Sequence, residues 1–206
     1  MELKDMTLSQ FAEALASKAA VPGGGGASAL AGALGAALGA MVGELTIGKP
    51  KYADVEAEVI EIMQKAMALQ RELLFLVEKD AAAFEPLSVA YGISKDDPAR
   101  AEVMENALKA ACAVPLEIME KCCAAIELHA ALSTRGSALA LSDVGVGVVC
   151  CKAALKGASL NVYINTRSMA NRAYAQAMET QADKMLEKYT KLADETYDYV
   201  AGRLRK

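Results

Sequence analysis

Four consecutive glycines, residues 23–26, open a stretch of small apolar residues that carries no charge until Glu44. Glycine loses more conformational freedom on folding than any other residue, so a compact fold that keeps four in a row needs the backbone that they allow. The residues that follow predict a helix from about Ala27 to Thr46, with the glycines as a loop at its start. The N–H groups of such a loop can hold a polar or anionic ligand, although a flexible entry to a closely packed helix fits the pattern as well.

The same predicted helix carries a ridge of glycines on one face, because Gly35, Gly39 and Gly43 recur at intervals of four residues. Such a ridge lets another backbone approach closely, which favours a central helix or a subunit contact. The uncharged stretch is only just long enough to cross a membrane, and it consists mostly of weakly apolar Ala and Gly. We therefore expect a buried helix and no membrane partner.

The chain of 206 residues is 54 % hydrophobic, with no Trp and three Phe. Because Ala and Leu are the best helix formers, this composition favours closely packed helices. Only Asn161–Ile164 could pass for a short strand. We predict one domain over residues 1–206, an all-α bundle of about six helices with long central helices. The predicted helices cover about 7–20, 27–46, 53–90, 99–132 with an interruption at Pro115, 142–165 and 168–204.

Charge, cysteine and histidine content narrow the possible functions. The formal net charge of −4 argues against nucleic acid as a partner. The first residues show no export signal, which predicts a cytoplasmic protein, and the five cysteines have no metal-ligand spacing. The single histidine, His129, has apolar neighbours and is expected to be packed or at the surface rather than catalytic. We therefore expect no metal, with carboxylates and amides carrying any chemistry.

Asp80 breaks the pattern of the long helix predicted over residues 53–90. It shares a face with Leu73, Leu76, Val77 and Phe84, which lie three, four or seven residues away. A carboxylate within an apolar stripe must be paired, protonated or at a ligand cavity, and burial would raise its pKa toward the range useful for acid/base catalysis. The alternative is an aspartate that faces a polar neighbour at the edge of the bundle.

Other polar residues have open interpretations. Asn161 and Asn165 lie one helical turn apart among apolar residues, where they could either cross-link helices or bind a heterocycle. Asp143, after Ser142, is expected to cap a helix and could also touch a ligand at a cleft. Lys49 lies in a predicted turn, where it is either solvated or a ligand contact.

Four segments together resemble the formiminotransferase-cyclodeaminase family: PGGGGASALAGALGAALGAMVGELTIGKPKY at 22–52, LVEKDAAAF at 76–84, LSDVGVG at 141–147 and LNVYINT at 160–166. The similarity is to the C-terminal cyclodeaminase domain of that family and to stand-alone bacterial methenyltetrahydrofolate cyclohydrolases of the same fold. It extends over essentially the whole chain, with the segments in the same order.

This resemblance implies an all-helical homodimer that acts on one-carbon derivatives of tetrahydrofolate, without a metal or a cofactor beyond the folate carrier. In the cyclodeaminase, N10 of the folate attacks the formimino carbon on N5, ammonia leaves and 5,10-methenyltetrahydrofolate forms. In the cyclohydrolase, water attacks the methenyl bridge and 10-formyltetrahydrofolate forms. We expect the cyclodeaminase, with the cyclohydrolase as the alternative. A non-catalytic folate-binding protein is a second alternative, against which Asp80 argues.

The resemblance also implies roles for individual residues. It makes Asp80 the catalytic general acid/base, which takes a proton from N10 or from water and returns it to the leaving group. The glycine segment and Ser28 would hold folate through backbone amides, and Lys49 would meet its glutamates. The implied substrate-binding residues are Gly23, Gly24, Gly25, Gly26, Ser28, Lys49, Asp143, Asn161 and Asn165.

Overall fold

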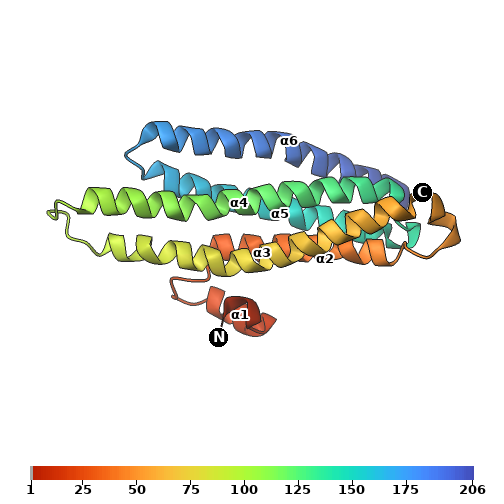
Figure 1. The fold of residues 1–206 in the computed structure, drawn as a ribbon, viewed down its shortest axis with the longest axis horizontal. Coiled ribbons are helices and arrows are strands. Elements are labelled where there is room, and N and C mark those ends of the chain that lie inside the picture. Colours follow the sequence, from red (N-terminus) through yellow and green to blue (C-terminus); the bar gives the residue numbers. More distant parts are fainter. Residues whose placement is uncertain (1) are drawn as a thin grey trace.

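The computed structural model describes residues 2–206, which form six α-helices and three short 3₁₀ helices without a strand (Figure 1). The all-α class is therefore confirmed, and the candidate strand at residues 161–164 is helical. The α-helices are α1 (Leu8–Leu15), α2 (Gly24–Glu44), α3 (Glu56–Tyr91), α4 (Arg100–Arg135), α5 (Leu141–Arg167) and α6 (Arg172–Leu204). The 3₁₀ helices are η1 (Leu3–Asp5), η2 (Pro50–Val55) and η3 (Ala138–Ala140).

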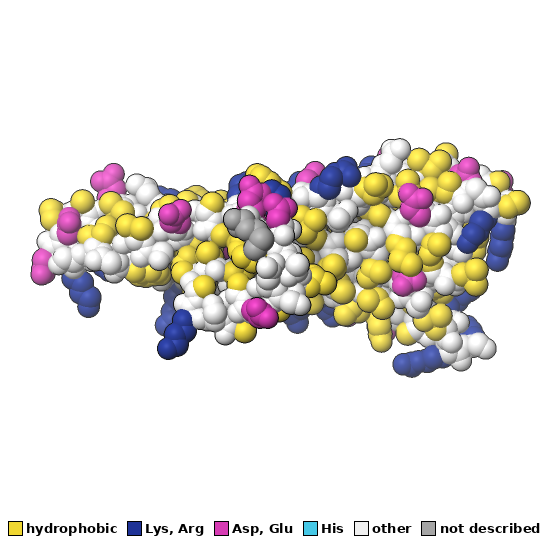
Figure 2. Space-filling model, turned by 90° about the horizontal axis from the view of Figure 1, so that it is seen from below, with side chains coloured by type: hydrophobic (Ala, Val, Ile, Leu, Met, Phe, Trp, Pro, Cys, Tyr) yellow, Lys and Arg dark blue, Asp and Glu magenta, His cyan; other side chains and the backbone are white. Residues whose placement is uncertain are grey.

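The five long helices run side by side along the long axis of the molecule (Figure 1). Helix α2 contacts α3, α4 and α5, and α6 packs on α4 and α5. The short α1 lies outside this bundle and packs against it through the buried Phe11. Seen from the side of α1, hydrophobic and charged side chains are interspersed over the surface (Figure 2).

The glycine ridge of α2 allows close packing, as its spacing predicts, but its members face three different helices. A Cβ built on Gly35 would lie 2.9 Å from the backbone oxygen of Gly147 in α5, and one on Gly43 would lie 2.6 Å from Cβ of Met63 in α3. Gly39 faces the ring of His129 in α4. Helix α2 is therefore the central helix that the others approach.

His129 is a packed residue of the core, which is one of the two non-catalytic positions, packed or at the surface, that its apolar neighbours predict. Its side chain is 1 % exposed, and its Nε2 lies 2.9 Å from the carbonyl oxygen of Gly35. A Cβ on Gly147 would lie 2.5 Å from the same nitrogen. Burial lowers the pKa of His129 to about 4, so the ring is neutral at physiological pH.

The cysteines also behave as small core residues. Four of the five are buried, and Cys150 is half-buried. Burial raises the pKa of the Cys151 thiol to about 12, which keeps it protonated and unreactive. Within residues 2–206, no three His, Cys, Asp or Glu side chains are grouped so that they could hold a metal ion.

Two segments, Gly24–Glu44 and Ala138–Arg167, are long and apolar enough to cross a membrane by length and composition. In the structure, 56 % and 50 % of their most apolar windows are buried within the bundle. The core helices of globular proteins pass the same test, and packing among the other helices accounts for the apolar character of these two.

Several predicted helix boundaries were wrong. The glycines are not a loop: Gly23 is the N-cap of α2, and Gly24, Gly25 and Gly26 form its first turn. Helix α4 continues without interruption through Pro115, and α1 ends at Leu15 rather than near Ala20. Helix propensity counts Gly and Pro as breakers, whereas here tertiary packing keeps both inside helices.

The predicted capping role of Asp143 was wrong as well. Helix α5 begins at Leu141 directly after η3, so its N-cap is Ala140 and no side chain caps the backbone there. Asp143 lies inside the first turn, where its negative charge still favours the positive end of the helix dipole.

Candidate active site

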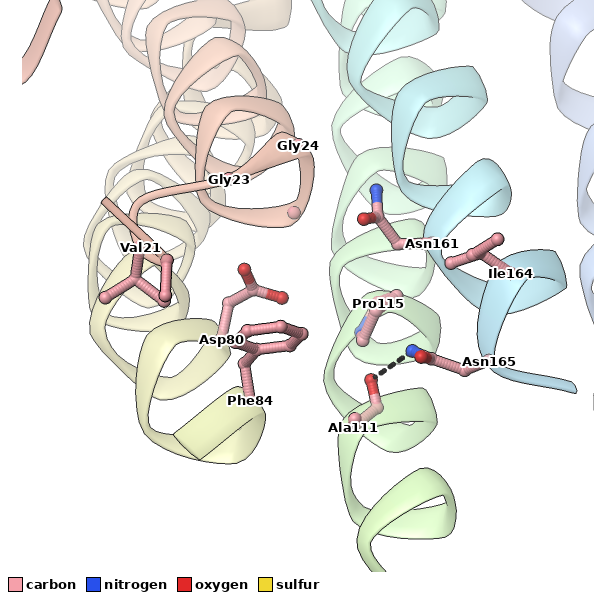
Figure 3. A pocket seen from close by; sticks show the side chains of 12 residues that line it. Val21, Gly23, Gly24, Asp80, Phe84, Ala111, Pro115, Asn161, Ile164 and Asn165 are labelled. Atoms are coloured by element: carbon pink, nitrogen blue, oxygen red, sulfur yellow. Dashed lines mark hydrogen bonds between the residues drawn. The ribbon is translucent and has the colours of Figure 1, made fainter. Parts of the chain in front are cut away.

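A cavity of 240 Å³ opens where the first turn of α2 faces α3, α4 and α5 (Figure 3). Its polar lining consists of Asp80, Asn161, Asn165 and the backbone of Gly23, Gly24 and Gly25. Its apolar lining consists of Ala20, Val21, Phe84, Ala111, Pro115 and Ile164. The cavity therefore has both the concave shape and the few convergent polar groups of a small-molecule site.

Asp80 stands on one wall of this cavity, where α3 passes under the start of α2 (Figure 3). Its neighbours along the stripe, Leu76 and Val77, are 1 % and 2 % exposed, while Asp80 itself is half-buried. The predicted apolar stripe with a carboxylate in it is therefore confirmed. Asp80 is the only charged residue that lines the cavity among those the structure describes.

The carboxyl group of Asp80 fits against the backbone of α2 because residue 25 has no side chain. A Cβ built on Gly25 would lie 2.5 Å from the carboxyl carbon of Asp80, closer than real Cβ atoms come to any other group. Burial raises the pKa of Asp80 above its ordinary value, while a hydrogen bond from the backbone N–H of Gly26 acts in the opposite direction. Such a carboxylate holds a proton more readily than an ordinary aspartate does, which suits it both to take up and to return one.

Asn161 and Asn165 face Asp80 from the opposite wall, on α5 (Figure 3). The side-chain Nδ2 of Asn161 donates to the carbonyl oxygen of Gly157, 3.0 Å away in its own helix. The Nδ2 of Asn165 donates across to the carbonyl oxygen of Ala111 in α4, also at 3.0 Å. The cross-linking interpretation is therefore confirmed for Asn165, which joins α5 to α4. Both amides line the cavity, and their binding of a heterocycle stays a prediction.

The glycine segment contributes unevenly to the cavity. Gly23, Gly24 and Gly25 line it, and a Cβ on Gly24 would lie 3.3 Å from Nδ2 of Asn161. Gly26 is buried behind this surface. The hydroxyl of Ser28 is turned away from the cavity, because it donates to the carbonyl oxygen of Gly24 at 2.7 Å and packs against Gly157.

Lys49 and Asp143 are not part of this cavity. Lys49 follows α2, a helix of 21 residues that is about 32 Å long, and it hydrogen-bonds Ser137 at 3.3 Å. Asp143 precedes Asn161 by about five turns of α5, or about 27 Å. Both residues therefore lie at the opposite end of the bundle, beyond the reach of a ligand that contacts Asp80 in the same chain.

Pro115 and Ala111 line the cavity, although the sequence analysis gave them no role there. A proline inside a strongly helical pattern leaves the carbonyl four residues earlier without its helical donor. Pro115 could therefore have pointed to Ala111 from the sequence alone, because an unpaired buried carbonyl needs a hydrogen-bond partner from another element. The apolar lining residues Val21 and Ile164 carry no comparable signal in the sequence.

The site as a whole combines a half-buried carboxylate, two amides and a helix N-terminus around one cavity. Acid/base catalysis on a small bound molecule needs groups of these kinds, so the fold and the site together indicate an all-helical enzyme.

The particular family follows from comparison with known proteins. Residues 7–184 match the family model described as formiminotransferase-cyclodeaminase. The chain is 38 % identical over 202 residues to the methenyltetrahydrofolate cyclohydrolase of Methylorubrum extorquens, covering 96 % of this chain and 97 % of that protein. The chain therefore belongs to the formiminotransferase-cyclodeaminase family, as its four sequence segments indicate.

Two further relatives agree with this assignment. The formimidoyltransferase-cyclodeaminase of Mus musculus is 29 % identical over 189 residues, which are 90 % of this chain but 35 % of the mouse protein. The crystal structure of formiminotetrahydrofolate cyclodeaminase from Thermotoga maritima superimposes with a TM-score of 0.84 at 26 % identity, covering 99 % of this chain and 98 % of that one. The relatives bear the names of both enzyme activities, cyclohydrolase and cyclodeaminase, that the resemblance implied.

Proposed function

We propose that this protein is a methenyltetrahydrofolate cyclohydrolase that hydrolyses 5,10-methenyltetrahydrofolate to 10-formyltetrahydrofolate. The observation that carries the chemistry is the position of Asp80, a half-buried carboxylate and the only charge lining the cavity among residues 2–206. The methenyl bridge is a cation delocalised over N5 and N10, so a single negative charge in a partly desolvated cavity is its electrostatic complement. The choice of activity is supported by the match to the Methylorubrum cyclohydrolase, which spans nearly all of both chains.

In the proposed reaction Asp80 moves one proton between two atoms of the substrate complex. As the oxygen of a water molecule bonds to the methenyl carbon, the Asp80 carboxylate takes one proton of that water. The bond from this carbon to N5 then breaks while Asp80 returns the proton to N5. The remaining hydroxyl proton leaves to solvent, and the formyl group stays on N10. Each turn of the cycle leaves Asp80 ionised again.

The remaining lining residues bind and orient in this proposal. The amides of Asn161 and Asn165 lie across the cavity from Asp80 and suit the polar edge of the pterin ring, while Phe84 and Ile164 supply apolar surface for its faces. The N-terminus of α2 adds backbone N–H groups and a positive dipole end beside Asp80. We propose no cofactor beyond the folate carrier.

Formiminotetrahydrofolate cyclodeaminase is the second candidate function. It was the activity expected first from the sequence, and the cyclohydrolase now takes precedence over it. The observation that favours it is the structural match to the Thermotoga maritima cyclodeaminase, which covers nearly the whole of both chains. In that reaction Asp80 would take the proton from N10 and return it to the departing ammonia. The same geometry serves both reactions, since each passes through a tetrahedral carbon between N5 and N10.

A two-substrate assay separates the candidates. Purified protein is supplied with 5,10-methenyltetrahydrofolate, and hydrolysis is followed by loss of the methenyl absorbance. In parallel, 5-formiminotetrahydrofolate is supplied and ammonia release is measured. The proposal predicts faster turnover of the methenyl substrate; ammonia release as the dominant activity would establish the cyclodeaminase instead. Turnover of neither substrate would refute both, with the Asp80→Asn variant as the background control.

We also propose that the protein forms a homodimer through the outward face of α2 and α5. Both helices carry exposed apolar side chains, including Leu34 and Met41 of α2 and Val146 and Val149 of α5. An antiparallel pairing would bring the Lys49 and Asp143 end of one protomer beside the cavity of its partner, where Lys49 could meet folate glutamates. Sedimentation equilibrium tests the pairing, and a monomer at micromolar concentration would contradict it.

A further inference from the structure

Pro115 lies deep inside α4, fifteen residues after the helix begins, and its ring nitrogen carries no hydrogen. In an unbroken helix the N–H of residue 115 would donate to the carbonyl of Ala111. Helix α4 continues past this point, so the Ala111 carbonyl is left without its helical donor. Because both residues are buried, that carbonyl needs a partner from elsewhere.

Asn165 supplies this partner from a different helix. Its Nδ2 donates to the Ala111 carbonyl oxygen at 3.0 Å, and Figure 3 shows this bond at the edge of the cavity. Only the NH₂ end of an amide can meet a carbonyl oxygen, so the contact determines which way the planar group is turned. Asn165, Ala111 and Pro115 all line the cavity that contains Asp80.

The fixed amide leaves an acceptor available to a ligand. Once Nδ2 is held on Ala111, the Oδ1 of Asn165 accepts no hydrogen bond from residues 2–206. The same is true of Asn161, whose Nδ2 is held on Gly157 one turn earlier on α5. The wall opposite Asp80 therefore offers two amide oxygens one helical turn apart, both acceptors.

We propose that Pro115 is a positioning residue: by withholding its N–H it keeps the Ala111 carbonyl free to orient Asn165, whose oxygen then accepts from the substrate. The ligand that fits is a ring edge with adjacent N–H donors, and the 2-amino-4-oxo-pyrimidine edge of a pterin has such donors at N3 and the 2-amino group. This substrate assignment rests on the proposed folate activity. The link between Pro115 and Asn165 does not.

A thermal-stability cycle tests the link without any assay of activity. With Pro115 present, Asn165→Ala removes the side-chain donor to a buried carbonyl and should lower the Tm by about 3–6 °C. With Pro115→Ala present, the new N–H at position 115 reclaims the Ala111 carbonyl, so the same Asn165→Ala change should cost less than about half as much. Equal losses in the two backgrounds would overturn the proposed link.

Binding and kinetics test the consequence for substrate. Pro115→Ala frees the Asn165 amide and should raise KM for 5,10-methenyltetrahydrofolate about threefold to tenfold, with kcat changed less than about twofold. Adding Asn165→Ala should raise KM little further, since both changes remove one oriented acceptor. A merely structural proline would leave KM unchanged, and that result would overturn the positioning role.

Pro86 provides the matched control, because it is also a proline inside a long helix, α3, but is exposed and does not line the cavity. Pro86→Ala should leave KM as it is in the unsubstituted protein.

If the protein turns over no folate, the proposed function fails, while the Tm cycle still decides the Pro115–Asn165 link. The dissociation constant for the unreactive 5-formyltetrahydrofolate then decides whether the site takes a pterin; no binding would overturn that assignment.

Discussion

The carboxyl group of Asp80 lies against the α-carbon of Gly25, so closely that a Cβ at residue 25 would come within 2.5 Å of the carboxyl carbon. This contact joins α3 to the first turn of α2 and holds the only charge that lines the cavity among residues 2–206. The absence of one side chain thus determines where the charged group can stand. Among the four consecutive glycines, Gly25 therefore has a specific role, which is to leave room for the carboxyl group of Asp80.

Replacing Gly25 should therefore damage the site more than the helix. In Gly25→Ala the added methyl group overlaps the Asp80 carboxyl group, so either the side chain or the first turn of α2 must move. We expect kcat/KM to fall at least about a hundredfold, because a misplacement of about 1 Å can cost that much, and the Tm to fall as well. Steady-state kinetics and thermal unfolding measure the two effects.

Gly202→Ala is the control for this substitution, since a Cβ there meets nothing within 4 Å and the residue lies in α6. It should keep full activity and gain a little stability from the better helix propensity of alanine. Full activity in Gly25→Ala would show that the contact with Asp80 does not position the carboxylate.

The pH dependence of stability should reveal the raised pKa of Asp80. Because burial raises the pKa in the folded state above the ordinary value of 3.8, folding favours the protonated form. The stabilisation from Asp80 is therefore complete below that ordinary value and is lost as the pH rises through the folded-state pKa. Relative to the wild type, Asp80→Asn should become more stable as the pH increases from about 4 through the folded-state pKa of Asp80.

Urea unfolding of both proteins at several pH values measures this difference. The comparison cancels the contributions of all other titrating groups, since they are shared by the two proteins. A difference in unfolding free energy that stays constant over the range would mean that the pKa of Asp80 is not shifted by folding.

His129 should make the fold sensitive to acid in the opposite sense. Its pKa is lowered from 6.5 to about 4 in the folded state, so stability present above 6.5 is lost as the pH falls toward 4. The shift corresponds to about 3 kcal/mol. His129→Leu should lower stability at neutral pH, through lost packing, yet flatten the acid limb of the stability profile. An acid limb as steep as that of the wild type would place the acid sensitivity elsewhere.

Several residues that line the cavity could be predicted from the sequence, because helical periodicity shows which residues share one face of a helix. Asp80 was recognised as an anomaly because it shares a helix face with the apolar residues Leu73, Leu76 and Val77. Asn161 and Asn165 are one helical turn apart, so both amides were predicted to lie on one side of their helix, and both line the cavity. The structure brings these two faces together at one cavity. The residues of one helix face can be predicted from the sequence without knowing which helices pack against each other.

Periodicity does not show at which end of a bundle a residue lies. Lys49 and Asp143 belong to motifs that resemble the family, yet they stand about 27 Å or more from the cavity in the same chain. The glycines were assigned to a loop because propensity counts against them in a helix. In the structure they begin α2, and Gly24 and Gly25 lie close to Asn161 and Asp80, which are their neighbours only in the folded chain.

The central claim, that Asp80 moves the proton in hydrolysis of the methenyl bridge, is tested most directly by kcat of Asp80→Asn with 5,10-methenyltetrahydrofolate. Asparagine keeps the size and polarity of the side chain but cannot take up a proton, so we predict that kcat falls about a hundredfold to ten-thousandfold. The KM should change little, because the binding surfaces remain. A kcat close to that of the wild type would contradict the account, since another group would then carry the proton.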